Sequence, residues 1–180
     1  MTIIFLNGCT SAGKSSLAQQ LQSSLDAPFL LTGIDDAFRM IPLRYHNSHD
    51  GFKFTKDSDN LVQLSFGDFG KATLYAHQLA VSAMGKSGSN MIVDEVVLNQ
   101  QLRTDWIRLL SDVDVFFVGV HCDLEELERR EIERGDRVIG QARGQYQTVH
   151  QEMPYDYEVN TTHTSPEDAA SLIIAQRTEW

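Results

Sequence analysis

The sequence between residues 8 and 15 reads Gly8-Cys9-Thr10-Ser11-Ala12-Gly13-Lys14-Ser15. This octapeptide fits G-x-x-x-x-G-K-[ST], a pattern typical of loops that wrap a phosphate group with their backbone N–H groups. An apolar run at residues 3–6 precedes it, and Leu17, Leu21 and Leu25 recur every four residues after it. The run predicts a buried strand and the leucine spacing predicts a helix, so the pattern lies between the two elements that it requires.

The residue types of this loop suit the chemistry of phosphate binding. Gly8 and Gly13 allow backbone angles and close approaches that a side chain would block. A helix that starts near Lys14 directs unpaired N–H groups and the positive end of its dipole at an anion. Lys14 can reach the β- and γ-phosphates, and the Ser15 hydroxyl can ligate Mg²⁺. The alternative is a glycine-rich turn that only connects strand to helix. We predict a nucleotide site made by Gly8, Cys9, Thr10, Ser11, Ala12, Gly13, Lys14, Ser15 and Ser16.

Composition narrows the classes of protein to which the chain can belong. Its 180 residues, 42% of them hydrophobic, suffice for one domain with a full core, so we take residues 1–180 as a single domain. A formal net charge of −10 counts against nucleic-acid binding, because a duplex binder needs a basic surface. No apolar run reaches the length of a membrane span and no basic leader precedes the first strand, so we expect a cytoplasmic protein without a membrane partner. The two cysteines, Cys9 and Cys122, form neither a disulfide framework nor a zinc motif.

Beyond the loop, apolar runs alternate with helical patterns, which predicts a parallel sheet covered by helices on both faces. Strands are expected at residues 28–32, 91–93, 113–120 and 157–161, and helices at residues 67–84, 98–110, 124–134 and from 166 onward. The run at 113–120 is the longest of these and predicts a central strand. Asp123 is a candidate N-cap for the helix at 124–134, with Glu126 completing a capping box. Residues 43–64 are polar without a clear period and predict a long functional loop.

Carboxylates follow two of the expected strands, at the edge where ligands of open α/β sheets bind. Asp94 ends one of these strands and is the candidate that orients Mg²⁺, with Glu95 as a weaker candidate. The alternative for Asp94 is an acidic cap on the next helix. Asp35 and Asp36 follow another strand, and a carboxylate there could accept a proton from a hydroxyl substrate. Capping of a helix at residues 37–41 explains these two aspartates equally well, so their spacing leaves both roles open.

Arginines are concentrated in one segment of this acidic chain. Five of the 15 Lys and Arg residues fall between positions 129 and 143, namely Arg129, Arg130, Arg134, Arg137 and Arg143. If the helix at 124–134 continues, Arg130, Arg134 and Arg137 share a face, and their guanidinium groups suit phosphate oxygens. We expect a lid at about residues 129–146 that neutralises charge on a transferring phosphoryl group, with Gly135 as a hinge. The alternative is a solvated helix with ion pairs such as Glu126–Arg130.

Together these residues resemble the chloramphenicol phosphotransferase family almost from end to end. The matching motifs are Ile4-Phe5-Leu6-Asn7-Gly8, Ser11-Ala12-Gly13-Lys14-Ser15, Gly33-Ile34-Asp35 with Pro42, Ile92-Val93-Asp94-Glu95-Val96, Val118-Gly119-Val120-His121-Cys122-Asp123, Arg130 with Arg134-Gly135-Asp136-Arg137-Val138, and Tyr155-Asp156 with Thr161-Thr162-His163. The phosphate loop alone is common to many kinases, but its combination with the Arg-Gly-Asp-Arg and Tyr-Asp motifs is much more specific.

The resemblance implies a P-loop kinase-type fold, with three layers around a five-stranded parallel sheet and an arginine-rich lid. It also implies an ATP-dependent O-phosphotransferase that uses Mg²⁺ and moves the γ-phosphoryl group to a hydroxyl of a small-molecule alcohol. In the family's named activity that alcohol is chloramphenicol, which phosphorylation inactivates. The implied acceptor region covers about residues 35–66. The implied site residues are Asp35 as general base, Lys14, Arg134 and Arg137 at the transferred phosphate, and Arg130 at the nucleotide.

One segment departs from the family. It reads Leu43-Arg44-Tyr45-His46-Asn47-Ser48-His49-Asp50, which is polar and basic and does not match an apolar antibiotic pocket. The general chemistry therefore transfers better than the substrate. Kinases of other small metabolites, such as shikimate, gluconate or adenylylsulfate, remain alternatives, as does a non-catalytic nucleotide-binding protein. The guanine-reading motif Asn-Lys-x-Asp is absent from the sequence, which counts against a GTP switch. Oligomeric state leaves no signal in the sequence.

Overall fold

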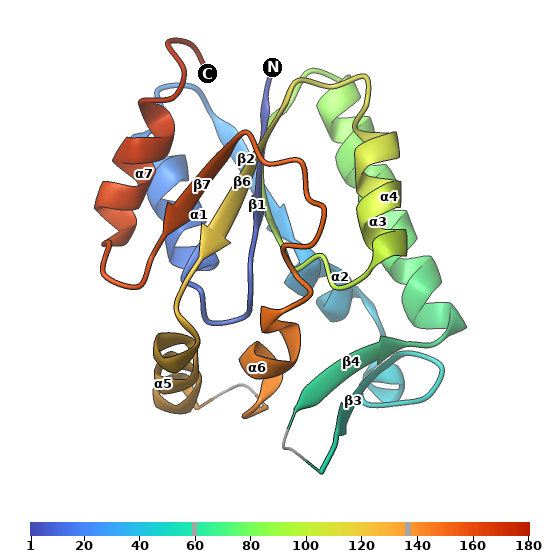
Figure 1. The fold of residues 1–180 in the computed structure, drawn as a ribbon. Coiled ribbons are helices and arrows are strands. Elements are labelled where there is room, and N and C mark those ends of the chain that lie inside the picture. Colours follow the sequence, from blue (N-terminus) through green and yellow to red (C-terminus); the bar gives the residue numbers. More distant parts are fainter. Residues whose placement is uncertain (59–60, 136–137) are drawn as a thin grey trace.

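The computed structural model describes residues 1–58, 61–135 and 138–180. Its centre is a five-stranded sheet with the order β2-β5-β1-β6-β7, in which every neighbouring pair is parallel (Figure 1). The strands are β1 (Ile3–Asn7), β2 (Phe29–Gly33), β5 (Asn90–Glu95), β6 (Val115–His121) and β7 (Tyr157–Asn160). The predicted α/β class and parallel sheet are confirmed. The run expected as the central strand became β6, which is an interior strand, whereas β1 takes the middle position.

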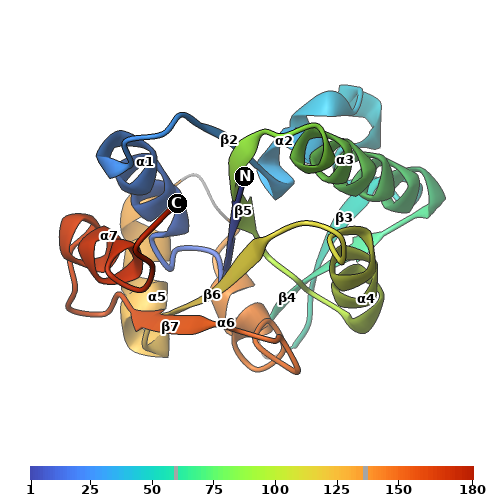
Figure 2. The same ribbon diagram turned by 90° about the horizontal axis from the view of Figure 1, so that it is seen from above.

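Helices cover both faces of the sheet, as the alternating pattern predicts (Figure 2). One face carries α1 (Lys14–Ser24) and α7 (Pro166–Ile174), and the other carries α3 (Asp68–Lys86) and α4 (Gln100–Leu109). The final helix begins as expected, because the Ser165 hydroxyl accepts a hydrogen bond from the backbone N–H of Asp168 at 3.1 Å. No helix in the described part of the chain is both long enough and apolar enough to cross a membrane.

The middle strand β1 contributes to two separate hydrophobic clusters. Ile4 and Leu6 pack with Leu17 of α1 on one face, whereas Ile3 and Phe5 pack on the other face. The cluster on that second face also contains Trp106 of α4 and Val81 of α3. Because its residues are buried on both sides, β1 is a continuous apolar run rather than an alternating one. This double burial fixes the end of β1, and therefore the start of the phosphate loop.

The segment at residues 43–64 is not a patternless loop, so that prediction was wrong. A short 3-10 helix at Leu43–Tyr45 is followed by an antiparallel hairpin of β3 (Phe52–Lys56) and β4 (Val62–Phe66). The hairpin alternates apolar and polar residues, but its strands are short and rich in Lys, Thr, Gln and Ser. Its apolar residues pack inward: the Phe52 and Phe66 rings meet edge to face with centroids 5.6 Å apart. The hairpin projects beyond the carboxyl ends of the parallel strands (Figure 1).

Three short helices complete this end of the molecule. They are α2 (Ile34–Met40), α5 (Leu124–Arg134) and α6 (Gln141–Tyr146), the last of which was not predicted. The helix α5 ends at Gly135, whose φ of 68° is left-handed, so it does not continue as one face of arginines. The capping box expected at Asp123 is also absent, because the Asp123 side chain makes no capping bond and Glu126 pairs with Arg129 and Arg130. The predicted site residue Arg137 lies outside the described residues.

Candidate active site

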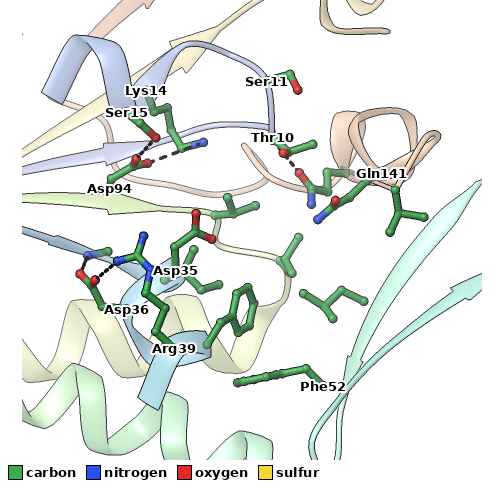
Figure 3. Close-up of a pocket in the computed structure, with 18 of the residues that line it drawn as sticks. Thr10, Ser11, Lys14, Ser15, Asp35, Asp36, Arg39, Phe52, Asp94 and Gln141 are labelled. Atoms are coloured by element: carbon green, nitrogen blue, oxygen red, sulfur yellow. Dashed lines mark hydrogen bonds and ion pairs between the residues drawn. The ribbon is translucent and has the colours of Figure 1, made fainter. Parts of the chain in front are cut away.

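A cavity of about 610 Å³ lies at the carboxyl ends of β1, β2 and β5 (Figure 3). Because these strands are parallel, the segments that follow them meet at one edge of the sheet. The hairpin β3–β4 closes another side of the cavity. The residues predicted from the sequence that line it are Thr10, Ser11, Gly13, Lys14, Ser15, Ser16, Asp35, Asp94 and Arg134. Of the other predicted residues, Cys9 and Ala12 belong to the loop but have buried side chains. Arg130 lines an adjoining hollow of about 350 Å³.

The backbone of the phosphate loop is wound tightly against the sheet. A Cβ atom at Gly8 would lie 2.3 Å from the carbonyl oxygen of Val120 in β6, so a side chain there would push the loop away. Ser11 and Gly13 have left-handed φ angles of 62° and 82°, which turn the loop back toward α1. The Ser11 hydroxyl is buried and has no hydrogen-bond partner among the described residues. A buried hydroxyl without a partner is costly, and a bound anion in this loop would satisfy it.

Lys14, Ser15 and Asp94 form a polar cluster where the loop meets β5 (Figure 3). The Lys14 side chain is only 6% exposed, and its Nζ donates to the carbonyl oxygen of Cys9 at 2.8 Å. The same Nζ lies 3.8 Å from Asp94 Oδ1. The Ser15 hydroxyl donates to Asp94 Oδ2 at 2.6 Å. A hydroxyl and a carboxylate oxygen beside a cation are groups that can hold a magnesium ion and the phosphate it accompanies.

Glu95, the neighbour of Asp94, has a different environment. Its side chain is buried, and burial, assisted by the charge of Asp94, raises the pKa of the Glu95 carboxyl to about 8. Its Oε1 lies 3.9 Å from Nδ1 of His77, a buried side chain whose pKa is lowered, chiefly by burial. A carboxyl that keeps its proton near neutral pH is a poor magnesium ligand. The protonation of Glu95 therefore favours Asp94 over Glu95 as the candidate magnesium ligand.

Asp35 and Asp36 have different surroundings, although the sequence leaves their roles open. Asp36 Oδ2 accepts hydrogen bonds from the backbone N–H of Gly33 at 3.0 Å and from the Thr32 hydroxyl at 2.9 Å. Its other oxygen accepts from Arg39. Asp36 therefore caps α2. Figure 3 shows the Asp35 carboxylate pointing into the cavity and away from Asp36.

The end of β2 lies close to Asp94. A Cβ atom at Gly33 would lie 2.2 Å from the carbonyl oxygen of Asp94, so only glycine fits between the two strands here. Asp35 lies two residues later, in the first turn of α2, and lines the same cavity as Lys14, Ser15 and Asp94. The arrangement brings a candidate base to the same cavity as the candidate phosphate-binding groups.

The far wall of the cavity is largely apolar. Its apolar side chains are Phe38 from α2, Phe52, Phe54 and Leu64 from the hairpin, and Val96, Leu98 and Val138. The polar segment at residues 43–50 contributes only His46 and Asn47. The apolar surface of the cavity therefore comes from α2, the hairpin and the segment after β5, and the polar segment that departs from the family lies mostly outside it.

The described arginines of the expected lid differ in what they contact. Arg134 lines both the main cavity and the adjoining hollow. Arg130 Nε donates to Glu126 Oε1, and its Nη2 donates to the carbonyl oxygen of Thr161, both at 2.7 Å. Arg129 and Arg143 form exposed ion pairs with glutamates of α5, and the Glu126–Arg130 pair named for the solvated alternative is also present. Among the described residues of this group, only Arg134 reaches the main cavity.

Two further residues line the cavity that sequence reasoning missed. Gln141 and Gln145 belong to α6, and both are buried. Gln145 Oε1 accepts a hydrogen bond of 2.8 Å from the backbone N–H of Thr10 in the phosphate loop. The glutamines are four residues apart, so recognising the short helix would have placed them on one face.

The chain is similar to known phosphotransferases and kinases. A family model described as "Chloramphenicol phosphotransferase-like protein" matches residues 1–178. A curated relative named "Putative O-phosphotransferase", from Mycobacterium tuberculosis strain H37Rv, is 31% identical over 176 residues, which cover 93% of this chain and 78% of the relative.

Solved structures with a similar fold include kinases of small molecules. A sugar kinase from Janibacter superposes with a TM-score of 0.67 at 14% identity and covers 97% of this chain and 93% of its own. The Mycobacterium tuberculosis APS kinase, solved with AMPPNP and APS, has a TM-score of 0.67 at 15% identity and covers 97% and 95%. The shikimate kinase of Acinetobacter baumannii, in complex with shikimate, has a TM-score of 0.61 at 15% identity and covers 98% and 95%. At these identities the likeness shows the fold alone.

Proposed function

Since the chain belongs to the chloramphenicol phosphotransferase-like family, we propose that it is an ATP- and Mg²⁺-dependent kinase that phosphorylates a hydroxyl group of a small molecule. One observation carries the proposal. A single cavity is lined by the phosphate loop with Lys14, by the Ser15–Asp94 pair and by Asp35. These are the groups needed to hold a phosphoryl donor and to receive a proton from the acceptor.

The phosphate loop fits a nucleotide in three respects. Its left-handed turns at Ser11 and Gly13 curve the backbone around a concave site. The unpaired N–H groups at the start of α1 add the positive end of the helix dipole. The buried Ser11 hydroxyl has no hydrogen-bond partner in the described part of the chain, and a phosphate oxygen would supply one. AMPPNP in the similar APS kinase supports placing the nucleotide in the equivalent loop here.

Ser15 and Asp94 fit a magnesium ion. A magnesium ion held there would neutralise negative charge on the phosphates and fix their orientation. Asp94 is 20% exposed, faces the loop and accepts from Ser15, so its oxygens already point toward the phosphate site. Lys14 places a second positive charge beside them. Arg134, which lines the main cavity and also the hollow beside Ser11 and Gly13, would stabilise charge on the transferred group.

Asp35 has the position of a proton acceptor. Its carboxylate enters the cavity between the polar cluster and the apolar wall, so an alcohol bound against that wall can present its hydroxyl to Asp35. Phosphoryl transfer has a loose transition state that needs little activation of the nucleophile. Asp35 therefore orients the hydroxyl and takes its proton late in the transfer.

The apolar wall favours an acceptor that carries a ring or another apolar group beside its hydroxyl. Phe38, Phe52 and Phe54 supply aromatic surface, while His46 and Asn47 supply polar contacts at one border. We place the acceptor region at about residues 35–66. Chloramphenicol has this combination of features, which makes it the first acceptor to test.

The decisive experiment measures ADP release from Mg-ATP with and without an acceptor. Chloramphenicol is compared with shikimate and gluconate at equal concentrations, and the rate without an acceptor is the background. A rate that depends on the acceptor and is lost in Asp35→Asn supports the proposal. Lys14→Ala with unchanged kinetics would overturn it, because the loop would then hold no triphosphate. Binding of ATP without transfer to any alcohol would favour the alternative of a non-catalytic nucleotide-binding protein.

A further inference from the structure

The helix α6 lies between the hairpin β3–β4 and the rest of the cavity wall. The backbone N–H of Val62 in β4 donates to the carbonyl oxygen of Gly140, just before α6, at 3.1 Å. A Cβ atom at Gly144 would lie 2.2 Å from the carbonyl oxygen of Val62. The helix therefore packs directly on the backbone of β4. Because the contact is close, a displacement of β4 displaces α6.

The side chain of Gln145 connects α6 to the phosphate loop. It is only 4% exposed, and its Oε1 accepts from the backbone N–H of Thr10 at 2.8 Å. The orientation of the amide is fixed by chemistry, because a backbone N–H can be satisfied only by the amide oxygen. This bond lies in the interior, where an unsatisfied N–H is costly. Thr10 therefore depends on Gln145 for its position.

A buried carboxylate fixes the start of α6 on α5. Glu131 is 1% exposed and accepts hydrogen bonds from the backbone N–H groups of Gly140 at 2.7 Å and Ala142 at 2.9 Å. Because both of its oxygens are used, α6 is held at its first turn by α5 and along its length by β4. Gln145, in the last turn, is thus aimed at the loop by a rigid support.

We propose that Gln145 is a positioning residue that holds the phosphate loop in its nucleotide-binding shape and makes that shape depend on the hairpin β3–β4. The inference rests on the proposed function in one respect, namely that the loop binds a nucleotide. Gln145 acts through Thr10 rather than on the transferred group. Because β4 packs on α6 through Val62, Gly140 and Gly144, a disturbance of this contact weakens nucleotide binding through Gln145.

Loss of the Gln145 bond changes how often the loop has the competent shape. Nucleotide affinity is proportional to the fraction of molecules whose loop keeps the competent shape. A buried N–H left without an acceptor shifts such an equilibrium by about 10-fold, so the affinity falls by up to this factor. Gln145→Met tests this cleanly, since methionine has a similar volume and helix propensity but no hydrogen-bond acceptor of comparable strength.

The first experiment titrates Mg-AMPPNP into the wild-type protein, Gln145→Met and Gln147→Met, and follows amide hydrogen exchange at Thr10. Gln147 is exposed next to the same helix and is the matched control. We expect Gln145→Met to bind more weakly by up to about 10-fold and to exchange the Thr10 amide faster, whereas Gln147→Met matches the wild type. Gln145→Glu keeps an acceptor oxygen and should restore protection of the Thr10 amide.

The second experiment tests the link to the hairpin with a double-mutant cycle. Gly144→Ala disturbs the contact with β4, although Gly144 does not line the cavity. We expect it to weaken binding of Mg-AMPPNP in the wild-type background but to have little further effect together with Gln145→Met. Independent, additive effects would overturn the link. If Gly144→Ala does not fold, Val62→Pro removes the backbone N–H that donates to Gly140 and so weakens the same contact.

Lys14→Ala separates failure of this inference from failure of the proposed function. One possible result is that the wild-type protein binds Mg-AMPPNP, that Lys14→Ala loses this binding, and that Gln145→Met binds like the wild type. In that case the positioning role is overturned and the proposed function stands. If the wild-type protein binds no nucleotide, both are overturned. Thermal unfolding of each variant confirms that the comparison is made between folded proteins.

Discussion

The Ser15 hydroxyl donates a 2.6 Å hydrogen bond to Asp94 Oδ2, which joins the end of the phosphate loop to the end of β5. The two residues are 79 positions apart in the chain, but β1 and β5 pair in parallel and bring them together. The carbonyl oxygen of Asp94 also packs against Gly33 at the end of β2. Asp94 is therefore the residue that joins the end of the phosphate loop to the end of β2, from which α2 begins.

Ser15→Ala should weaken nucleotide binding mainly when Mg²⁺ is present. Alanine keeps the helix start but removes the hydroxyl that we place on the ion, so the affinity for Mg-ATP should fall by about 10- to 100-fold. The affinity for ATP in EDTA should change little. Calorimetric titration with and without Mg²⁺ measures both values. Ser23→Ala, in the same helix with its hydroxyl bonded to Gln19, is the control. An equal loss in both conditions would contradict the metal role of Ser15.

Asp35→Asn should abolish turnover without weakening nucleotide binding. The amide has the same shape but cannot take the proton, so kcat should fall by about 10²- to 10⁴-fold. Steady-state kinetics with a productive acceptor, together with titration of Mg-ATP, tests this separation. Full turnover by Asp35→Asn would exclude it as the general base.

Asp36→Ala should show the opposite behaviour. It removes the acceptor for the backbone N–H of Gly33 and for the Thr32 hydroxyl, so the free energy of unfolding should fall by about 1 kcal/mol. Turnover per folded molecule should fall far less than in Asp35→Asn. Urea unfolding and kinetics on the same preparation measure the two effects. A loss of turnover as large as that of Asp35→Asn would mean that the aspartates share the catalytic role.

These two aspartates also show where prediction from the sequence reached its limit. The local pattern places both after a strand, and either can cap a helix or face a ligand. The two aspartates differ in the structure because the Asp36 carboxylate accepts a hydrogen bond from the backbone N–H of Gly33, whereas Asp35 lines the cavity. By contrast, the phosphate loop was predictable because its signal is local: an apolar strand, two glycines and a helix with regular leucines.

The hairpin and α6 could not be predicted for a different reason. The strands β3 and β4 are defined by tertiary packing, such as that of Phe52 against Phe38 with ring centroids 4.3 Å apart. Gln145 reaches Thr10 from 135 positions away, and no short-range pattern signals that contact. Sequence reasoning therefore found the candidate residues for phosphate binding, and it missed the segments that shape the cavity around them.

Glu131→Gln should destabilise the protein although it changes only one atom. Both carboxylate oxygens accept backbone N–H groups, so an amide would direct its NH₂ group at one of these donors. We expect the free energy of unfolding to fall by about 1–3 kcal/mol. Glu128→Gln, which disturbs a surface ion pair with Arg143, should cost less than about 1 kcal/mol. Urea unfolding of the two variants provides the comparison, and equal effects would contradict the structural role of Glu131.

Glu95 should make the stability of the protein depend on pH in a defined direction. Burial raises the pKa of Glu95 to about 8 in the folded protein, compared with 4.5 for an ordinary glutamate. Between these values the folded state holds a proton that the unfolded state has released. The stability that the neutral carboxyl provides is therefore complete below pH 4.5 and is lost as the pH rises toward 8.

Glu95→Gln should remove this dependence, because glutamine resembles the protonated carboxyl and does not titrate. As the pH rises between these limits, the unfolding free energy of the wild-type protein should fall relative to that of Glu95→Gln by up to about 1.4 kcal/mol per pH unit. Urea unfolding of both proteins without Mg²⁺ at several pH values measures the slopes. His77 lies beside Glu95, and burial lowers the pKa of its imidazole, so His77→Gln serves as a second comparison. Parallel slopes for the wild-type protein and Glu95→Gln would show that Glu95 is ionised in the folded state, and Asp94 would then lie beside a second negative charge.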